Sequence, residues 1–157
     1  MFKYSSQNFQ QTKNLAKILA LEAIKAKKGN KALVFALVGD LGSGKTTFIQ
    51  GFMKGLGIKR RITSPSFVIF KNYQLSTNNQ QSTTNNYRKI YHIDVYRLRK
   101  QKDILDLGLK EILADPLNLV LIEWADKIKS VLPKNTIWIK FRHRKRENER
   151  LITISNY

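Results

Sequence analysis

The chain has 157 residues, of which 42% are hydrophobic, and its 29 Lys and Arg outnumber its 11 Asp and Glu to give a formal net charge of +18. This length and apolar content predict one globular domain that spans residues 1–157. The absence of cysteine excludes disulfides, catalytic thiols and thiolate metal sites, and no apolar run approaches the roughly 18 residues of a membrane-spanning helix.

The first part of the chain has the pattern of helix, buried strand and helix. Apolar residues recur at helical spacing over residues 12–27, which predicts a helix packed on a sheet and ended by the glycine turn at 28–30. The run Leu33–Val38 is almost continuously apolar and predicts a central strand covered on both faces. A second apolar stripe over 48–56 predicts another helix, which the glycines near its end should stop.

A phosphate-binding motif lies between this strand and the second helix. Gly39, Gly44, Lys45 and Thr46 fit the pattern G-x-x-x-x-G-K-[ST]. Glycines let backbone N–H groups approach a polyphosphate, and the start of a helix adds unpaired amides and a positive dipole. Lys45 would contact the β- and γ-phosphates, and the Thr46 hydroxyl would bind Mg²⁺. Thr47 is a weaker candidate for the metal because the motif gives that role to the preceding residue.

A loop rich in hydroxyl groups and a polar insert follow. Ser64, Pro65 and Ser66 form a turn that has two interpretations, a segment that senses the γ-phosphate or metal, or an ordinary loop before a strand at 67–73. Residues 74–87 are rich in Gln, Asn, Ser and Thr, which predicts a flexible insert at the tip of a β-hairpin.

Two later strands each end on a carboxylate. Asp94 closes the short strand at 90–94, and Glu123 closes the apolar strand at 117–122. In an NTPase with a phosphate loop, an acid at a strand end completes the Mg²⁺ shell, and a second acid can orient or deprotonate the attacking water. His92 would share a face with Asp94, but a lone histidine is more often a structural residue than a base.

The remaining sequence predicts the rest of an α/β domain. A helical pattern over 102–113 predicts a crossover helix, and a short helix should follow Trp124. Strands at 136–141 and 150–155 should pair across the basic turn at 142–150, which is either a solvated loop or a contact for tRNA or nucleotide. The whole pattern predicts a three-layer fold of the phosphate-loop NTPase type, with a mixed, mostly parallel sheet, flanking helices and an antiparallel hairpin.

Four motifs in this order, GDLGSGKTT, TSPSF, HIDVYRL and IEWADKI, closely resemble the bacterial TsaE (YjeE) family over roughly residues 5–140. The resemblance implies a Mg²⁺-dependent ATPase in the synthesis of N6-threonylcarbamoyladenosine in tRNA, which works with the TsaD and TsaB proteins. We expect slow hydrolysis by the protein alone, because the sequence shows no obvious in-built arginine finger. It also implies a switch role for the loop around Ser64, a metal role for Asp94, and a place for Glu123 and Trp124 beside the nucleotide. Ser66 departs from the family, which usually has Thr there.

The candidate catalytic residues are therefore Lys45, Asp94 and Glu123, and the candidate metal ligands are Thr46, Asp94 and Glu123. The residues expected to contact ATP are Asp40, Leu41, Gly42, Ser43, Gly44, Lys45, Thr46, Thr47, Ser64, Ser66 and Trp124.

Two other functions stay open. The same loop with Glu123 as a base would serve a small-molecule kinase, although the chain has little room for an acceptor-binding lid; the absence of an N-K-x-D motif disfavours a GTPase. The charge of +18 suits a basic module that binds nucleic acid or an acidic protein, yet abundant Lys, Asn and Ile also fit an AT-rich coding bias.

The first residues, MFKYSSQNFQQTKN, lack the apolar core of a secretion signal, so we expect a cytoplasmic protein.

Overall fold

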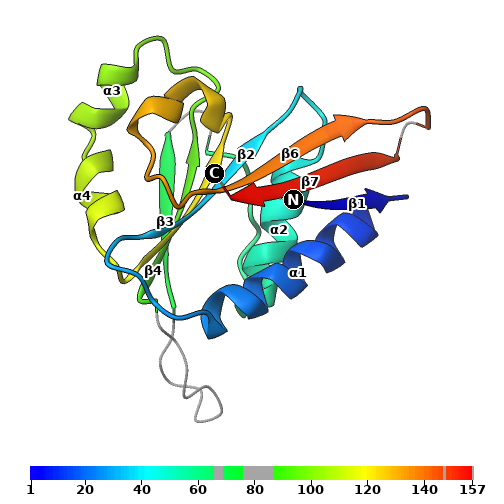
Figure 1. Ribbon diagram of the computed structural model, residues 1–157, viewed down its shortest axis with the longest axis horizontal. Coiled ribbons are helices and arrows are strands. Elements are labelled where there is room, and N and C mark those ends of the chain that lie inside the picture. The colour runs from blue at the N-terminus through cyan, green and yellow to red at the C-terminus, as the bar shows by residue number, and fades with distance from the viewer. Residues whose placement is uncertain (66–68, 76–86, 147, 157) are drawn as a thin grey trace.

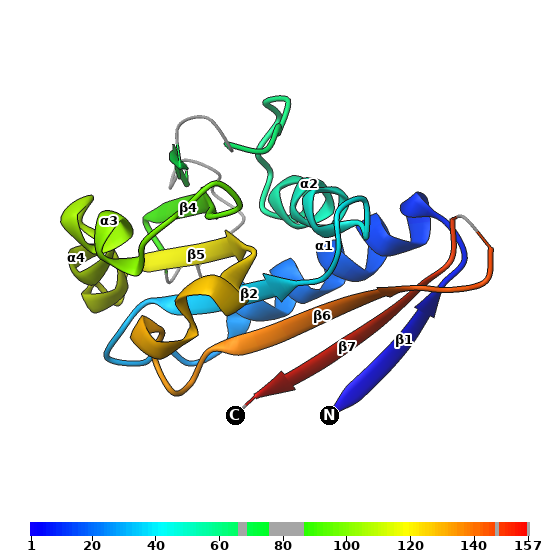
Figure 2. The same cartoon turned by 90° about the horizontal axis from the view of Figure 1, so that it is seen from above.

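A seven-stranded sheet with helices on both faces forms the molecule (Figures 1 and 2). The computed structural model describes residues 1–65, 69–75, 87–146 and 148–156. In chain order the elements are β1 (Phe2–Ser6), α1 (Phe9–Lys25), β2 (Leu33–Val38), α2 (Lys45–Gly55), β3 (Phe70–Gln74), β4 (Lys89–Asp94), α3 (Gln101–Asp106), α4 (Leu109–Ala114), β5 (Asn118–Glu123), the 3-10 helix η1 (Ala125–Val131), β6 (Ile137–His143) and β7 (Arg150–Asn156).

The sheet has a parallel centre and antiparallel flanks. Its strand order is β1-β7-β6-β2-β5-β4-β3, which places β2 in the middle, as its apolar run predicted. Strand β2 pairs in parallel with β5 and β6, and β5 pairs in parallel with β4. On one flank β3 pairs antiparallel with β4, and on the other β7 pairs antiparallel with β6 and β1. The predicted three-layer α/β fold with a mixed sheet is confirmed.

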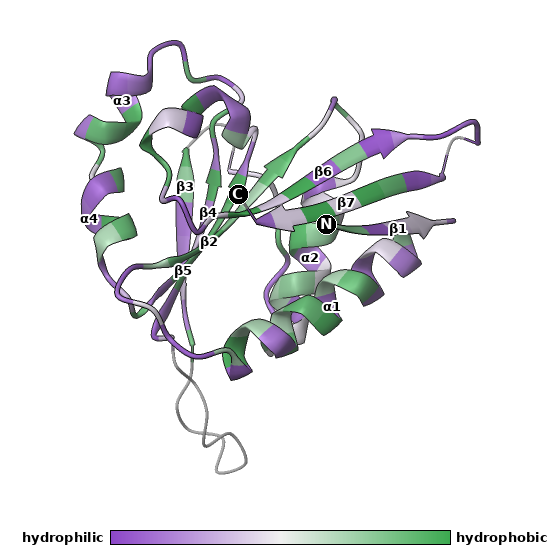
Figure 3. Ribbon diagram, in the orientation of Figure 1, coloured by the Kyte–Doolittle hydropathy of each residue, from purple (hydrophilic) through white to green (hydrophobic). Residues whose placement is uncertain are grey.

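Alternation along the strands separates two hydrophobic cores. Phe35 and Leu37 of β2 face α1 and α2, whereas Val34 and Ala36 face α3, α4 and η1. The core beneath α2 also contains the aromatic residues Phe48, Phe52 and Phe141. Figure 3 shows the hydrophobic residues concentrated on the central strands and on the helix faces that cover them. None of the helices that the structure describes is long and apolar enough to cross a membrane.

Two helix predictions need correction. Helix α1 ends at Lys25 because Ala26 turns to an extended conformation (φ −62°, ψ 145°), so the glycine turn at 28–30 does not end it. The single helix predicted over 102–113 is two short helices, because Gly108 has φ 87° between α3 and α4. A periodic apolar pattern continues through such a break, which is why the pattern alone suggested one helix.

The boundaries of several strands also differ from the predictions. Strand β1 was not predicted, and it pairs with β7 at one edge of the sheet. Strand β3 begins at Phe70, and the positions before it at 66–68 lie outside the described residues, as does 76–86 of the predicted insert. Leu75 and Tyr87, at the two ends of that insert, are buried in the core, so the polar segment is shorter than predicted.

The basic turn predicted at 142–150 is shorter as well. Arg142 and His143 belong to β6, and Arg150 begins β7. The connection between the two strands is therefore confined to residues 144–149, of which 147 lies outside the described residues.

Glycines let α2 approach α1 closely. A Cβ atom on Gly51 would lie 2.4 Å from the carbonyl oxygen of Lys13, and one on Gly55 would lie 3.0 Å from the Cβ of Ala20. Gly55 is thus a packing residue within the helix. Gly57, with φ 79°, is the residue that ends α2, since Gly57 and Ile58 donate N–H groups back to its last carbonyls.

We expect Gly51→Ala to lower the free energy of unfolding by about 1–3 kcal/mol, because the added methyl group collides with the backbone of α1. Urea denaturation measures this change. Gly29→Ala is the control, since no atom lies within 4 Å of the position of its Cβ. Equal stability of Gly51→Ala and Gly29→Ala would contradict the close packing of the two helices.

Candidate functional site

The loop from β2 to α2 adopts the shape that its glycines permit. Gly44 has φ 103° and begins α2 without a side-chain cap. Gly39 has φ 151°, and a Cβ atom there would lie 2.5 Å from the carbonyl oxygen of Phe141. A larger residue at position 39 would push the loop away from β6. The first N–H groups of α2 remain available to an anion, as at other helix starts.

Lys45 lies at the start of α2 and is almost completely buried. Its Nζ donates hydrogen bonds to the carbonyl oxygens of Gly39 (2.7 Å) and Asp40 (2.8 Å). The same Nζ lies 3.7 Å from the ring centroid of Trp124. Burial lowers the pKa of Lys45 below its ordinary value, and the nearby carboxylates of Glu123 and Asp94 oppose this effect. The side chain therefore holds a poorly hydrated cation against the inner side of the loop.

Asp94 and Glu123 lie side by side at the ends of β4 and β5, where the two residues are paired in register. The hydroxyl of Thr46 donates to Glu123, with Oγ1 2.8 Å from Oε2. His92 Nε2 lies 2.9 Å from Glu123 Oε1, and both side chains are buried. Within the described residues His92 Nδ1 is buried without a partner, so we assign the ring proton to Nε2, which donates to Glu123.

A second set of contacts holds Asp94. The Ser64 hydroxyl donates to Asp94 Oδ2, and the backbone N–H of Tyr96 donates to Oδ1 at 2.8 Å. The ring of Tyr96 lies against Trp124, with centroids 4.9 Å apart. Trp124 has a left-handed backbone (φ 60°, ψ 35°), which is uncommon for a bulky residue and turns its ring toward Lys45.

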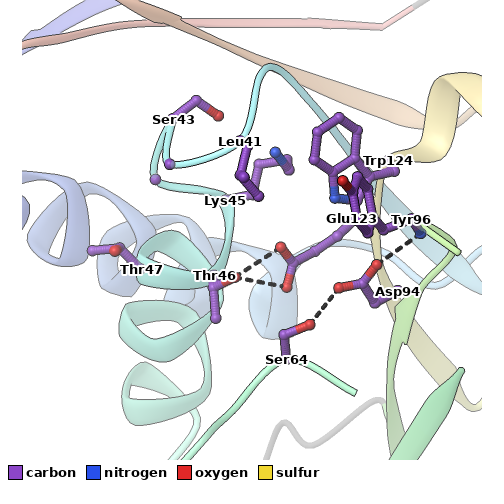
Figure 4. A pocket seen from close by; sticks show the side chains of 12 residues that line it. Leu41, Ser43, Lys45, Thr46, Thr47, Ser64, Asp94, Tyr96, Glu123 and Trp124 are labelled. Carbon is purple, nitrogen blue, oxygen red and sulfur yellow. Dashed lines mark hydrogen bonds between the residues drawn. The ribbon is translucent and has the colours of Figure 1, made fainter. Parts of the chain in front are cut away.

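These residues line one cavity of about 240 Å³ (Figure 4). Its walls are formed by Leu41, Gly42, Ser43, Gly44, Lys45, Thr46, Thr47, Ser64, Asp94, Tyr96, Glu123 and Trp124. The sequence-predicted site residues are thus brought together, with two exceptions. Asp40 is exposed outside the lining and contributes its carbonyl oxygen to Lys45 and to the N–H of Ser43. Ser66 lies outside the described residues.

Three residues contribute to the site that the sequence did not indicate. Tyr96 supports both Asp94 and Trp124. Arg150, at the start of β7, donates to the carbonyl oxygens of Ser43 (Nε, 3.1 Å) and Gly42 (Nη2, 3.0 Å). His143 Nε2 lies 3.4 Å from the carbonyl oxygen of Leu41. The hairpin of β6 and β7 therefore supports the outer side of the loop, and no local motif could signal a contact between residues over 100 positions apart.

Comparison with known families identifies the chain. The model of the family described as "Threonylcarbamoyl adenosine biosynthesis protein TsaE" matches residues 6–152, which extends beyond the region of resemblance seen in the motifs. A crystal structure of Bacillus subtilis YdiB superposes with a TM-score of 0.73 at 34% sequence identity, covering 98% of this chain and 83% of that one.

Curated relatives from two bacteria have the same family name. The chain is 39% identical over 153 residues to the tRNA threonylcarbamoyladenosine biosynthesis protein TsaE of Bacillus subtilis, which covers 98% of this chain and 84% of that protein. It is 37% identical over 148 residues to the protein of the same name from Rickettsia felis, with coverage of 94% and 75%. The match over nearly the whole length, together with the shared fold, shows that this chain belongs to the TsaE family.

Proposed function

We propose that this protein is a Mg²⁺-dependent ATPase that acts as a switch on a complex of TsaD and TsaB during threonylcarbamoyladenosine modification of tRNA. The observation that carries the proposal is the single cavity in which the phosphate loop and Lys45 face two carboxylates paired in register, Asp94 and Glu123. Membership of the TsaE family supports the pathway, because its members are named for this biosynthesis.

The loop side of the cavity would bind the triphosphate. Backbone N–H groups of residues 42–47 and the ammonium of Lys45 would contact its oxygens, as the helix dipole favours negative charge there. Trp124 and Leu41 offer apolar surface at the rim of the same cavity. Arg150 would hold the shape of the loop from outside, and the carbonyl oxygen of Asp40, within the loop, would hold Lys45 on its inner side.

The opposite wall would bind the metal. Thr46, Asp94 and Glu123 supply hydroxyl and carboxylate oxygens, which are hard ligands of the kind that Mg²⁺ prefers. The described residues contain no group of three or more His, Cys, Asp or Glu that could enclose a metal ion. Mg²⁺ in nucleotide sites usually binds through one or two carboxylates and the phosphates themselves, so this donor set fits it. When bound, the ion would neutralise charge on the phosphates.

Glu123 is best placed to orient the attacking water. Thr46 and His92 hold its two oxygens, so the carboxylate has a defined direction at the cavity wall. Asp94 is held by Ser64, which connects the loop at 63–65 to the metal side of the site. A phosphate-dependent shift of Asp94 would move Ser64 with it, and this loop would then report the nucleotide state to a partner.

The test is ATP turnover with and without purified TsaD and TsaB, measured both as released phosphate and as phosphorylated product. We expect slow release by the protein alone, stimulation of about tenfold or more by the two partners, and no phosphorylated acceptor. An equivalent yield of a phosphorylated small molecule would show a kinase instead. A rate that the partners leave unchanged would contradict the switch role.

A further inference from the structure

The sheet face of β1, β7 and β6 that points away from α1 carries side chains that the proposed ATPase does not use. Side chains alternate between the two faces of the sheet, and Ile139, Phe141 and Ile152 lie in the core under α1 and α2. Their neighbours along the same strands point to the other face of the sheet. Figure 2 shows these three strands extending beyond η1, with α1 on one side only.

The strand register arranges these outward residues in rows. Lys3 of β1 and Lys140 of β6 are both paired with Thr153 of β7, which lies between them. In the next row Leu151 is paired with Arg142. The Cα atoms of Lys140 and Arg142, two residues apart along β6, are thus about 6.7 Å apart, and both side chains lie on the same face of the sheet.

A groove of about 470 Å³ runs over this face and is bordered by η1. We call the surface that lines this groove the basic sheet face, and define it by the residues Lys3, Lys129, Trp138, Lys140, Arg142 and Thr153. Trp138 is half-buried at one end, and Lys129 Nζ lies 5.7 Å from its ring centroid. An aromatic ring beside several cations offers a stacking surface for a base next to contacts for phosphates.

Cations outnumber carboxylates among the described residues of this face. Asp126 is the carboxylate residue among those that line the groove. The ion pairs of the described part of the chain include Lys25–Glu22, His92–Glu123 and Arg146–Glu149, and Lys3, Lys140 and Arg142 belong to none of these three. Arg144 and Lys145 continue the positive charge into the turn beyond β6.

We propose that the basic sheet face binds a single-stranded segment of RNA, with its phosphates along β6 and a base stacked on Trp138. Charge complementarity alone would also suit an acidic protein, but the cluster of cations beside an aromatic ring favours a polynucleotide, which offers both phosphates and bases. The strand from Trp138 to Arg142 spans about 13 Å, enough for two to three nucleotides. This inference goes beyond the ATPase and does not depend on it.

Fluorescence anisotropy with a labelled oligouridylate of about 12 nucleotides, at salt from about 50 to 200 mM, tests the proposal. The variant combines Lys3→Gln, Lys140→Gln and Arg142→Gln. We expect its dissociation constant to rise at least about tenfold. The slope of log affinity against log salt should fall in magnitude by about two units, since each of three lost phosphate contacts on a single strand reduces it by about 0.7. Trp138→Leu should weaken binding of the single strand about tenfold and leave binding of an RNA duplex unchanged.

The matched control combines Lys27→Gln, Lys102→Gln and Lys110→Gln, which removes the same charge from exposed positions elsewhere. We expect it to bind the oligouridylate within about twofold of the wild type. The proposal would be overturned if both triple variants lost the same affinity for the oligouridylate, or if the wild type did not bind it. It would also be overturned if polyglutamate displaced the labelled oligouridylate as effectively as the unlabelled oligouridylate does. Circular dichroism confirms that the variants fold, and Lys45→Ala should retain RNA binding, which separates this surface from the nucleotide site.

Discussion

Replacing Glu123 by glutamine is expected to lower partner-stimulated ATP hydrolysis about 10²–10³-fold while changing ATP affinity less than about tenfold. The glutamine oxygen can still accept from Thr46 or His92, which now hold the carboxylate at 2.8 Å and 2.9 Å. The substitution therefore removes the negative charge and the proton-accepting power of the side chain while its shape stays the same. Rapid-mixing measurements of phosphate release and equilibrium binding of a fluorescent ATP analogue give the two quantities.

Asp126→Asn is the matched control for this substitution. Asp126 lies three residues further along the chain, is exposed, and carries the same kind of charge close to the cavity. We expect its hydrolysis rate to stay within about twofold of the wild type, because it does not line the site. A Glu123→Gln protein that hydrolyses ATP at the wild-type rate would remove Glu123 from the reaction and leave Asp94 as the remaining acid.

Local patterns were sufficient to predict the centre of the site. The strand Leu33–Val38 has the predicted bounds, and the glycines before Lys45 form a loop at the start of a helix. The sequence places Asp94 and Glu123 each at the end of a strand, and it is the structure that shows these two strands to be neighbours. Each of these features depends on residues close together in sequence.

The features that sequence could not predict depend on contacts between distant segments. Arg150 reaches the phosphate loop because β7 pairs with β6, and β6 lies beside β2. Strand β1 is mostly exposed at the sheet edge, so it lacks the strong alternation of a buried strand. Trp124 faces Lys45 because its backbone is left-handed, a conformation that its residue type does not suggest.

Lys45→Ala is expected to raise the dissociation constant for ATP about 10- to 150-fold. In the structure the ammonium group already lies inside the cavity, held by two loop carbonyls and by the ring of Trp124. Because burial has removed most of its hydration, a phosphate can contact it without the full penalty of displacing water, as the lowered pKa indicates. A charge-assisted hydrogen bond of this kind contributes about 1.5–3 kcal/mol.

The control is Lys54→Ala, because Lys54 is exposed in the last turn of the same helix and does not line the cavity. Its ATP affinity should remain within about twofold of the wild type, since a screened surface charge contributes little. Thermal unfolding of both variants separates loss of binding from loss of the fold. If Lys45→Ala hydrolysed ATP at the wild-type rate with TsaD and TsaB present, the loop would not be the phosphate site, and the proposed ATPase would be wrong. Loss of affinity in Lys45→Ala alone would instead place the triphosphate between the loop and the two carboxylates, because Lys45 is the cation that lies between them.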